Sequence, residues 1–483
     1  MTRRTVGVFA TAAAATLAGQ AAGATTAGWP QPNGDLGGTR AVSSPITART
    51  VAGLRVRWRY PLTRGSTFGT FASTPVVVGK TVYVQDLSSS VTAIDLRTGA
   101  RRWQYLTQAP NDGPNGLAVS GGRIFTATDT SVLALDLHTG KRIWAKRLVN
   151  RFEQFVDIAP LAARGLVYTS TIGLAPGGRG ALYALDQRTG KVRWRFDTIR
   201  DPWKFPSAGG GGAWYPPSLG LDGRLYYGIS NPGPWGGSPI RPNGGMFPGP
   251  TPYTDALVAL DATSGKLRWY DQVTKHDVRD YDLEASPIVV GDRVFGAGKA
   301  GRIVAWDRGS GKRVWSNSVG THLHDLGPLP STPTKVCPGL WGGVLTPMAY
   351  ADGRLFAPVV ERCMTERAND PVHPESLYAG DGIVAALSAK TGKKLWTRRV
   401  GAPPTGCATV ASDVVFVPTL DGRVQAFDTE DGRRLWETST RAGINGCPSV
   451  AGATLLVGAG APLANGKRGV PELSAYTLPG YVS

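Results

Sequence analysis

Acidic residues are scarce in this chain of 483 residues. There are 35 Asp and Glu against 53 Lys and Arg, which gives a formal net charge of +18. A basic balance can attract nucleic acid, but these Lys and Arg are spread along the chain and form no block. We therefore expect a solvated basic surface, with at most a loose attraction to an anionic cell wall and no nucleic-acid partner.

Cysteine is also scarce, and many catalytic motifs are missing. The four cysteines form neither a CxxC nor a CxxCH spacing, which argues against a thiol metal site and against a covalently attached haem. No GxSxG, phosphate-loop or zinc-protease motif occurs, so the sequence gives no support to a hydrolase or a kinase.

No apolar run is long enough to span a membrane. The best candidate, VGVFATAAAATLAG, follows Arg3 and Arg4 and precedes the small residues of QAAGATTAG. This layout is typical of a secretory signal that is cleaved near Ala24, and too short for an anchor helix. We expect residues 1–24 to be a signal peptide and residues 25–483 to form one exported domain without a transmembrane segment.

The strongest positive signal is an internal repeat that ends in tryptophan. Each copy reads as an alternating apolar strand, a tight turn with glycine, and a second strand. Asp and Thr or Ser before the glycine can bond the backbone of the turn, which needs a left-handed residue. The seven copies are AIDLRTGARRW, ALDLHTGKRIW, ALDQRTGKVRW, ALDATSGKLRW, AWDRGSGKRVW, ALSAKTGKKLW and AFDTEDGRRLW.

These repeats predict an all-β propeller with eight blades. Shorter apolar alternations upstream of each copy supply about four strands per unit, and the tryptophans can pack between neighbouring sheets. An eighth unit is split: ELSAYTLPG near the C-terminus lacks the tryptophan strand, which VAGLRVRWRY near the N-terminus supplies. Joining the two ends would close the ring and leave few exposed strand edges.

Two long insertions interrupt the otherwise tight spacing, between Trp194 and Trp269 and between Trp315 and Trp396. Insertions in repeat proteins collect on one face, which is commonly the binding face. We expect the parts around 232–253 and 320–338 to line that face.

A run of acids, KHDVRDYDLEAS, follows the first insertion. It places Asp277, Asp280, Asp282 and Glu284 within ten residues. Acids in a loop are most often solvated or paired with neighbouring bases, here Lys275 and Arg279. The alternative is a metal and base site, which the flanking sequence favours.

The chain resembles the pyrroloquinoline quinone (PQQ) dehydrogenases for methanol and ethanol and their propeller relatives. The resemblance covers nearly all of residues 25–483. It includes the entry segment WPQPNGDLGGTRAVSSPITARTVAGLRVRW, the tryptophan repeats, GGGGAWYPPSLGLDGRLYYGISNPGPW and KHDVRDYDLEASPIVV. In that family PQQ lies across the propeller axis against a tryptophan, with a metal ion at its quinone edge.

This resemblance implies a role for five residues. Trp214 would be the stacking surface for PQQ, Asn231 a metal ligand, and Asp280 both the catalytic base and a metal neighbour. Lys299 would contact the reactive quinone oxygen. Asp282 matches the additional carboxylate of members that use a lanthanide in place of calcium, because a more highly charged cation needs more anionic oxygen ligands.

Other family contacts are absent. The position of the family's metal-binding Glu falls near Ala175. Asn115 stands where the family has an Arg that binds a PQQ carboxylate. Ala72 stands where the family has a Glu before the first full blade. Asp157 replaces a cofactor-binding Thr, and Arg279 replaces a Trp beside the base. The adjacent cysteine pair that covers the cofactor is also missing.

Four cysteines in an exported chain predict two disulfides. Cys337 and Cys363 bracket a segment that is similar to one closed by a disulfide in the dehydrogenases. Cys407 and Cys447 occupy matching places in adjacent repeats, so their pairing would join two blades. His322 and His324 alternate in THLHDLG and can converge on a metal, although ordinary loop histidines are commoner.

Two functions follow as hypotheses. The first is PQQ- and metal-dependent oxidation of a small alcohol, with calcium or a lanthanide as the ion and hydride passing to the quinone. The second is a non-catalytic propeller of the cell envelope that binds a protein partner, because fold alone does not decide function.

Overall fold

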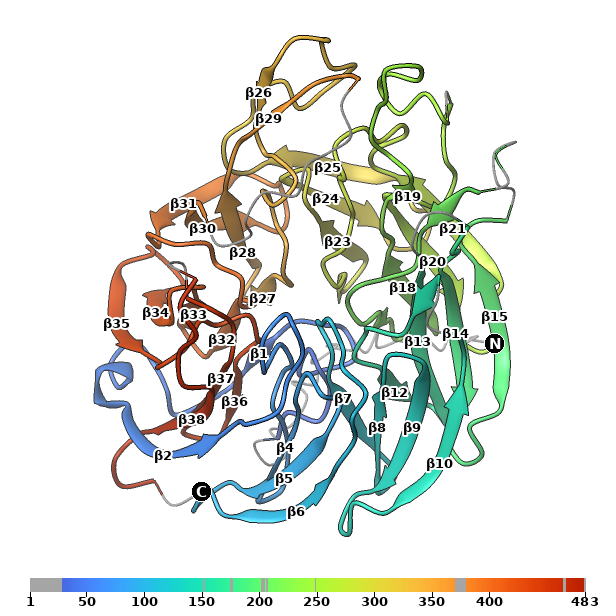
Figure 1. Ribbon diagram of the computed structural model, residues 1–483. Helices are drawn as coiled ribbons and strands as arrows, with labels where there is room; N and C mark the ends of the chain where they lie inside the picture. Colours follow the sequence, from blue (N-terminus) through green and yellow to red (C-terminus); the bar gives the residue numbers. More distant parts are fainter. Residues whose placement is uncertain are drawn as a thin grey trace, which may run out of the picture.

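The computed structural model describes residues 28–150, 153–173, 177–200, 205, 207–247, 249–369, 379–463 and 466–481. The predicted signal peptide, residues 1–24, lies outside the described residues. The predicted eight-bladed propeller is confirmed: eight antiparallel sheets form a ring, each with its first strand toward the centre (Figure 1). A single short 3-10 turn, η1 (Val51–Gly53), occurs in the described part of the chain.

The first four blades follow one another along the chain. Their strands, from the centre outward, are β3 (Val76–Val78), β4 (Thr81–Gln85), β5 (Val91–Asp95) and β6 (Arg101–Tyr105); β7 (Leu117–Ser120), β8 (Arg123–Ala127), β9 (Ser131–Asp136) and β10 (Arg142–Arg147); β12 (Leu161–Ala163), β13 (Leu166–Gly173), β14 (Ala181–Asp186) and β15 (Val192–Asp197); and β17 (Ser218–Leu219), β18 (Arg224–Gly228), β20 (Ala256–Asp261) and β21 (Leu267–Gln272).

The next three blades repeat this order. Their strands are β22 (Ile288–Val290), β23 (Arg293–Ala297), β24 (Arg302–Asp307) and β25 (Arg313–Ser318); β27 (Ala349–Ala351), β28 (Arg354–Glu361), β30 (Asp381–Ser388) and β31 (Lys394–Arg399); and β32 (Thr409–Ala411), β33 (Val414–Pro418), β34 (Arg423–Asp428) and β35 (Arg434–Ser439). Short accessory strands are β1 (Ala41–Val42), β11 (Gln154–Phe155), β16 (Gly209–Gly210), β19 (Pro232–Gly233), β26 (Thr334–Val336) and β29 (Met364–Glu366).

The eighth blade joins the two ends of the chain, as the split repeat predicts. It consists of β36 (Ser449–Ala451), β37 (Thr454–Ala459), β38 (Glu472–Thr477) and the N-terminal β2 (Arg55–Pro61). Trp58 of β2 pairs with Ala475 of β38. Figure 1 shows β2 beside β38. The ring therefore closes by hydrogen bonds between strands more than 400 residues apart in sequence.

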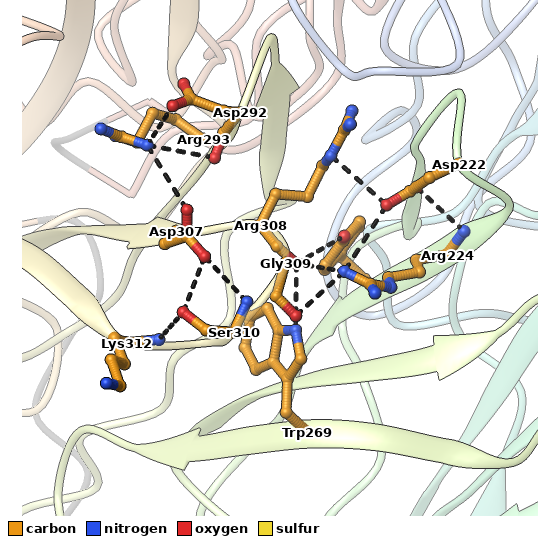
Figure 2. A network of polar contacts seen from close by, with 11 residues as sticks. Asp222, Arg224, Trp269, Asp292, Arg293, Asp307, Arg308, Gly309, Ser310 and Lys312 are labelled. Atoms are coloured by element: carbon orange, nitrogen blue, oxygen red, sulfur yellow. Dashed lines mark hydrogen bonds and ion pairs between the residues drawn. The ribbon is translucent and has the colours of Figure 1, made fainter.

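Six of the blade tryptophans each bond to a turn of the following blade. Trp269 Nε1 donates to the carbonyl oxygen of Arg308 at 3.1 Å, in the turn of the following blade. Figure 2 shows this turn, where Arg224 also donates to the same carbonyl oxygen and Arg308 pairs with Asp222. The same ring-to-turn bond, at 2.9–3.2 Å, is made by Trp58, Trp144, Trp194, Trp315 and Trp396.

The turn glycine is required for two reasons. Gly311 has a φ of +71°, which is costly for residues with a side chain. A Cβ atom at Gly311 would also lie 2.5 Å from the ring of Trp269. Both conditions recur, with φ between +69° and +74°, at Gly99, Gly140, Gly190, Gly265, Gly392 and Gly432. The repeat thus encodes a left-handed turn that fits against the preceding blade's tryptophan.

An N-terminal segment, residues 29–42, crosses the centre of the ring. Its backbone bonds to the first strands of six blades, at Val77, Val119, Leu219, Val289, Tyr350 and Val410. Gln31 Nε2 donates to Ala162 O of a seventh blade, and the fully buried Arg40 donates to Pro448 O at the edge of the eighth. One short segment therefore ties all eight blades together at the hub.

Both predicted disulfides are confirmed. Cys337 bonds to Cys363 and Cys407 bonds to Cys447. The second pair links the chain just before β32 to the chain just before β36, so it joins two neighbouring blades near the hub. Among the described residues, no helix has the length and apolarity needed to cross a membrane.

Candidate functional site

The acid run lies inside the protein, between β21 and β22. Its four acids, Asp277, Asp280, Asp282 and Glu284, are 3%, 8%, 1% and 8% exposed. Of the two interpretations of this run, solvated loop acids are therefore ruled out. Such burial is expensive for carboxylates unless cations or hydrogen bonds compensate it.

Lys299 is the cation that faces this run. Its Nζ lies 2.5 Å from Asp280 Oδ2 and 2.6 Å from Asp282 Oδ2. Lys299 comes from the turn between β23 and β24, and its backbone N–H donates to the carbonyl oxygen of Asp282 at 3.0 Å. The acids thus pair with a lysine of the next blade, and not with the nearby Lys275 or Arg279.

Backbone bonds bring Asn231 to this group and hold the glycine run that precedes Trp214 beside Asn231. Asn231 N–H donates to Asp282 Oδ1 at 2.6 Å. The glycine run before Trp214 pairs with the chain around Asn231: β16 pairs with β19, and Gly211 N–H donates to Asn231 O at 2.9 Å. The ring of Trp214 lies 5.8 Å from that of Phe155 and is partly exposed.

Asp280 has an unusual backbone and an unusual acidity. Its φ is +62°, a left-handed value found at few residues other than glycine and concentrated at functional sites. Burial raises the pKa of Asp280 to about 7; Lys299 opposes this rise and Asp282 adds to it. At neutral pH the carboxyl group can therefore both accept and release a proton.

Lys299 stays charged in spite of its burial. Burial lowers the pKa of its ammonium group, but Asp280, Asp282 and Glu284 together outweigh this and raise it well above the ordinary value. The charged Lys299 holds the two aspartates in place and puts a positive charge near the centre of the ring.

One acid of the site escaped the sequence reasoning. Asp255 is fully buried, and neither of its carboxylate oxygens has a hydrogen-bond partner. Burial raises the pKa of Asp255 well above its ordinary range, and Asp277, Asp282 and Asp280 add to the rise. Asp255 lies at the end of the first insertion, directly before ALVALD. An acid next to a buried strand is the one sequence feature that could have pointed to it.

The donor set suits a hard cation, although the described residues do not form a complete cage. Asp280, Asp282 and Asn231 supply oxygen donors, and Glu284 Oε1 and both oxygens of Asp255 lack partners. Carboxylate and amide oxygens are what calcium-like ions prefer. No group of three His, Cys, Asp or Glu with ligand geometry occurs in the described part of the chain, and Ala175 lies outside it.

Blades on another side of the hub carry a different set of side chains. Ala72, Asn115 and Asp157 are all buried and lie around residues 111–116. Asp157 Oδ1 accepts from Gly113 N–H at 3.0 Å, and Asn115 Nδ2 donates to Asp86 O at 2.8 Å. The second carboxylate oxygen of Asp157, Oδ2, and the side-chain oxygen of Asn115, Oδ1, have no hydrogen-bond partner.

These orphaned acceptors fit the carboxylates of PQQ poorly. A ligand carboxylate needs N–H or O–H donors or a cation, and Asn115 stands where the family has an arginine. Burial raises the pKa of Asp157 to about 8, and Asp112 adds to the rise. Below that pH the neutral carboxyl group of Asp157 can offer an O–H, and no cation is among the groups that shift its pKa.

The remaining candidate residues have structural partners. His322 Nδ1 lies 2.8 Å from Asp325 Oδ2, and its Nε2 donates to Val319 O. His324 Nδ1 lies 2.9 Å from Lys335 O. The two histidines therefore do not converge on a shared ligand. Arg279 contacts Gly327, whose carbonyl oxygen accepts a hydrogen bond from its guanidinium at 2.9 Å.

Two family models match the chain. The β-propeller domain of glucose, ethanol and alcohol dehydrogenases, a PQQ family, matches residues 29–129 and 170–296. The outer membrane protein assembly factor BamB matches residues 109–210 and 380–476. The first model contains Trp214, Asn231, Asp280 and Asp282, and ends three residues before Lys299.

Curated relatives point to the same proteins. The quinohemoprotein alcohol dehydrogenase of Comamonas testosteroni is 30% identical over 379 residues, which cover 66% of this chain and 52% of that protein. The lanthanide-dependent methanol dehydrogenase of Methylacidiphilum fumariolicum is 26% identical and is covered to 77%, over 81% of this chain. The chain spans about half the length of the first of these relatives.

Solved structures agree on the fold. The crystal structure of the Comamonas testosteroni enzyme superposes with a TM-score of 0.81 at 24% identity, over 94% of this chain and 81% of that one. A europium-containing methanol dehydrogenase gives a TM-score of 0.79 at 22% identity, over 94% of this chain and 98% of that one.

Proposed function

Because the chain is a relative of the quinoprotein alcohol and methanol dehydrogenases, we propose that it oxidises a small alcohol with PQQ and a metal ion as cofactors. The observation that carries this proposal is the buried Lys299 ammonium held between Asp280 and Asp282. A buried base of pKa near 7 beside a fixed cation, at the hub of this fold, is suited to proton abstraction.

The cofactors would supply hydride acceptance and Lewis acidity, with Trp214 as the stacking surface for PQQ and Asn231, Asp280 and Asp282 as ligands of calcium or a lanthanide. The chain itself would provide position and charge. Asn231 N–H holds Asp282, and Lys299 holds both aspartates, so the acids keep their orientation without rearrangement during the reaction.

Asp280 would take the hydroxyl proton of the alcohol. A base works best when its pKa lies near the working pH, and the pKa of Asp280 is about 7. Burial keeps bulk water from competing for this carboxylate, since Asp280 is 8% exposed.

We place the protein outside the cytoplasm, with a signal peptide over residues 1–24 and a mature domain from residue 25. The support is the layout around Arg3, Arg4 and Ala24 and the presence of two disulfides, which persist in oxidising compartments. The N-terminal sequence of the secreted protein tests this: a start near residue 25 is expected, and an intact Met1 would contradict it.

The activity is tested by dye reduction. Purified protein with PQQ and either calcium or lanthanum should reduce an electron-accepting dye when an alcohol is added. Asp280→Asn should lower the rate by at least about 100-fold, because general-base catalysis contributes that much. Full activity of Asp280→Asn would show that Asp280 is not the base. No turnover of the unmodified protein with either metal would reject the proposed dehydrogenase activity.

A second candidate function is binding of a protein in the cell envelope. The match to the BamB assembly factor over residues 109–210 and 380–476 supports it, together with Ala72 and Asn115 in place of family contacts. For this function we expect a folded protein that neither binds PQQ nor reduces dye.

A further inference from the structure

A cavity of about 380 Å³ lies against the acid run, and neither Asp280 nor Lys299 is among its lining residues. Its walls come from the acid run itself and from both long insertions, which contribute Asn243 and residues 325–328. Asn243 fixes this arrangement, because its Nδ2 donates to Leu329 O and its Oδ1 accepts from Leu329 N–H. His276 Nε2 donates to Asn243 O at 2.8 Å and adds a third loop. The cavity is therefore held open by bonds between its walls.

Arg279 is one of the lining residues of this cavity, and its buried guanidinium has donors without a hydrogen-bond partner. It is 4% exposed, and its guanidinium makes one bond, to Gly327 O. Its Nε and Nη2 atoms have no hydrogen-bond partner. A buried guanidinium with unpaired donors is costly, and a bound anion would offset that cost with charge-assisted bonds.

The other charges at the cavity leave Arg279 available. Asp325 pairs with Arg302 at 2.8 Å and with His322, and Asp277 accepts the backbone N–H groups of Arg279 and Tyr281. Lys275 also lines the cavity and makes no ion pair within the described residues. The two acids are thus satisfied, while two cations have no anionic partner.

The remaining lining is apolar, with Val273, Val278, Leu326 and Pro328 among it. A bare oxyanion would leave these walls without contacts, whereas an acid with an apolar body would cover them. We infer that this cavity binds a small organic carboxylate, whose charged end pairs with Arg279 and Lys275 and whose apolar body lies against the valines and Leu326. The cavity shares the acid run with the hub site but is lined by neither Asp280 nor Lys299.

Binding is tested by calorimetry on the full-length mature protein without added PQQ or metal. The probe is benzoate, with benzamide as its neutral counterpart and inorganic phosphate as an anion without an apolar body. We expect saturable binding of one benzoate and at least about 10-fold weaker binding of benzamide. Equal affinity for benzamide, binding of phosphate alone, or no binding of benzoate would each overturn the inference.

Variants assign the binding to the two cations. Arg279→Gln should lower benzoate affinity by at least about 10-fold, and Lys275→Gln, at an exposed position, by about 2- to 5-fold. Arg241→Gln is the control, an exposed arginine of the first insertion that does not line the cavity. Should Arg279→Gln fail to fold, Lys275→Gln decides: benzoate affinity equal to that of the Arg241→Gln control would contradict the site.

Discussion

Two sides of the hub differ in how they handle charge. On the first, which we term the Lys299 side, Asn231, Asp280, Asp282 and Lys299 form a bonded group. On the second, the Asp157 side, Asn115 and Asp157 present oxygens without hydrogen-bond partners, and no cation is among the groups that shift the pKa of Asp157. The first side is suited to proton transfer and cation binding, and on the second Asn115 stands where the resembling family has an arginine. One fold can therefore keep the groups that would do chemistry while losing those that would hold the cofactor.

Removing the lysine should produce the largest effect. Lys299→Met leaves Asp280 and Asp282 buried without their cation, and breaking such a group costs about 3–5 kcal/mol in the free energy of unfolding. Urea denaturation measures it. Lys390→Met, on an exposed turn, is the control and should change stability by less than about 0.5 kcal/mol. A similar small loss for both variants would show that the Lys299 side is not a linked charge group.

Replacing Asp157 by a residue that cannot ionise should stabilise the protein, in contrast to the loss expected for Lys299→Met. The pKa of Asp157 is about 8 in the folded protein, against an ordinary value of 3.8. Between these values the unfolded chain binds fewer protons than the folded one, so the free energy of unfolding falls as the pH rises. Asp157→Asn should remove this loss and stabilise the protein by about 1–3 kcal/mol more at pH 8 than at pH 5.

Thermal unfolding at the two pH values measures the effect of Asp157→Asn. The control is Asp352→Asn, at an exposed turn. An equal effect of Asp157→Asn at both pH values would mean that Asp157 is already ionised in the folded state.

Restoring positive charge to the Asp157 side should sharpen the contrast. In the double variant Asn115→Arg with Asp157→Thr, an arginine can pair with a ligand carboxylate, and we expect PQQ to bind about 10-fold more tightly than to the unmodified protein. Fluorescence titration measures the affinity, with Asn115→Gln as the uncharged control. Unchanged affinity in the double variant would show that this side does not face the cofactor.

The tryptophans at the rim of the ring show how much one hydrogen bond between blades contributes to the free energy of unfolding. Trp269→Phe keeps an aromatic ring and removes the bond from Nε1 to Arg308 O, which should cost about 1 kcal/mol. Trp436→Phe is the matched control, because Trp436 makes no such bond in the described residues. Equal losses at both positions would mean that ring packing alone joins the blades.

The sequence was sufficient for the rim and insufficient for the hub. Each repeat is local, so Gly311 and Trp269 could be assigned to a turn and a blade-to-blade contact from spacing alone. The central segment could not be foreseen, because its bonds reach from nearby Val77 to Val410, which is hundreds of positions away in the sequence. No periodicity records such contacts.

The candidate site was only partly foreseeable for the same reason. Asp280, Asp282 and Lys299 were named through a resemblance, and their placement within hydrogen-bond distance depends on two adjacent blades. Asp255 was missed because a single acid carries no pattern. The burial of the acid run was also underestimated, since loop acids are usually solvated and only the ring geometry encloses this loop.

Titration of PQQ into the purified protein, followed by tryptophan emission with calcium or lanthanum present, tests the central claim most directly. The Lys299 side predicts saturable, metal-dependent quenching with one PQQ per chain, weakened by at least about 10-fold in a variant with both Asp280→Asn and Asp282→Asn. Quenching that ignores the metal and both substitutions, or no quenching at all, would contradict it.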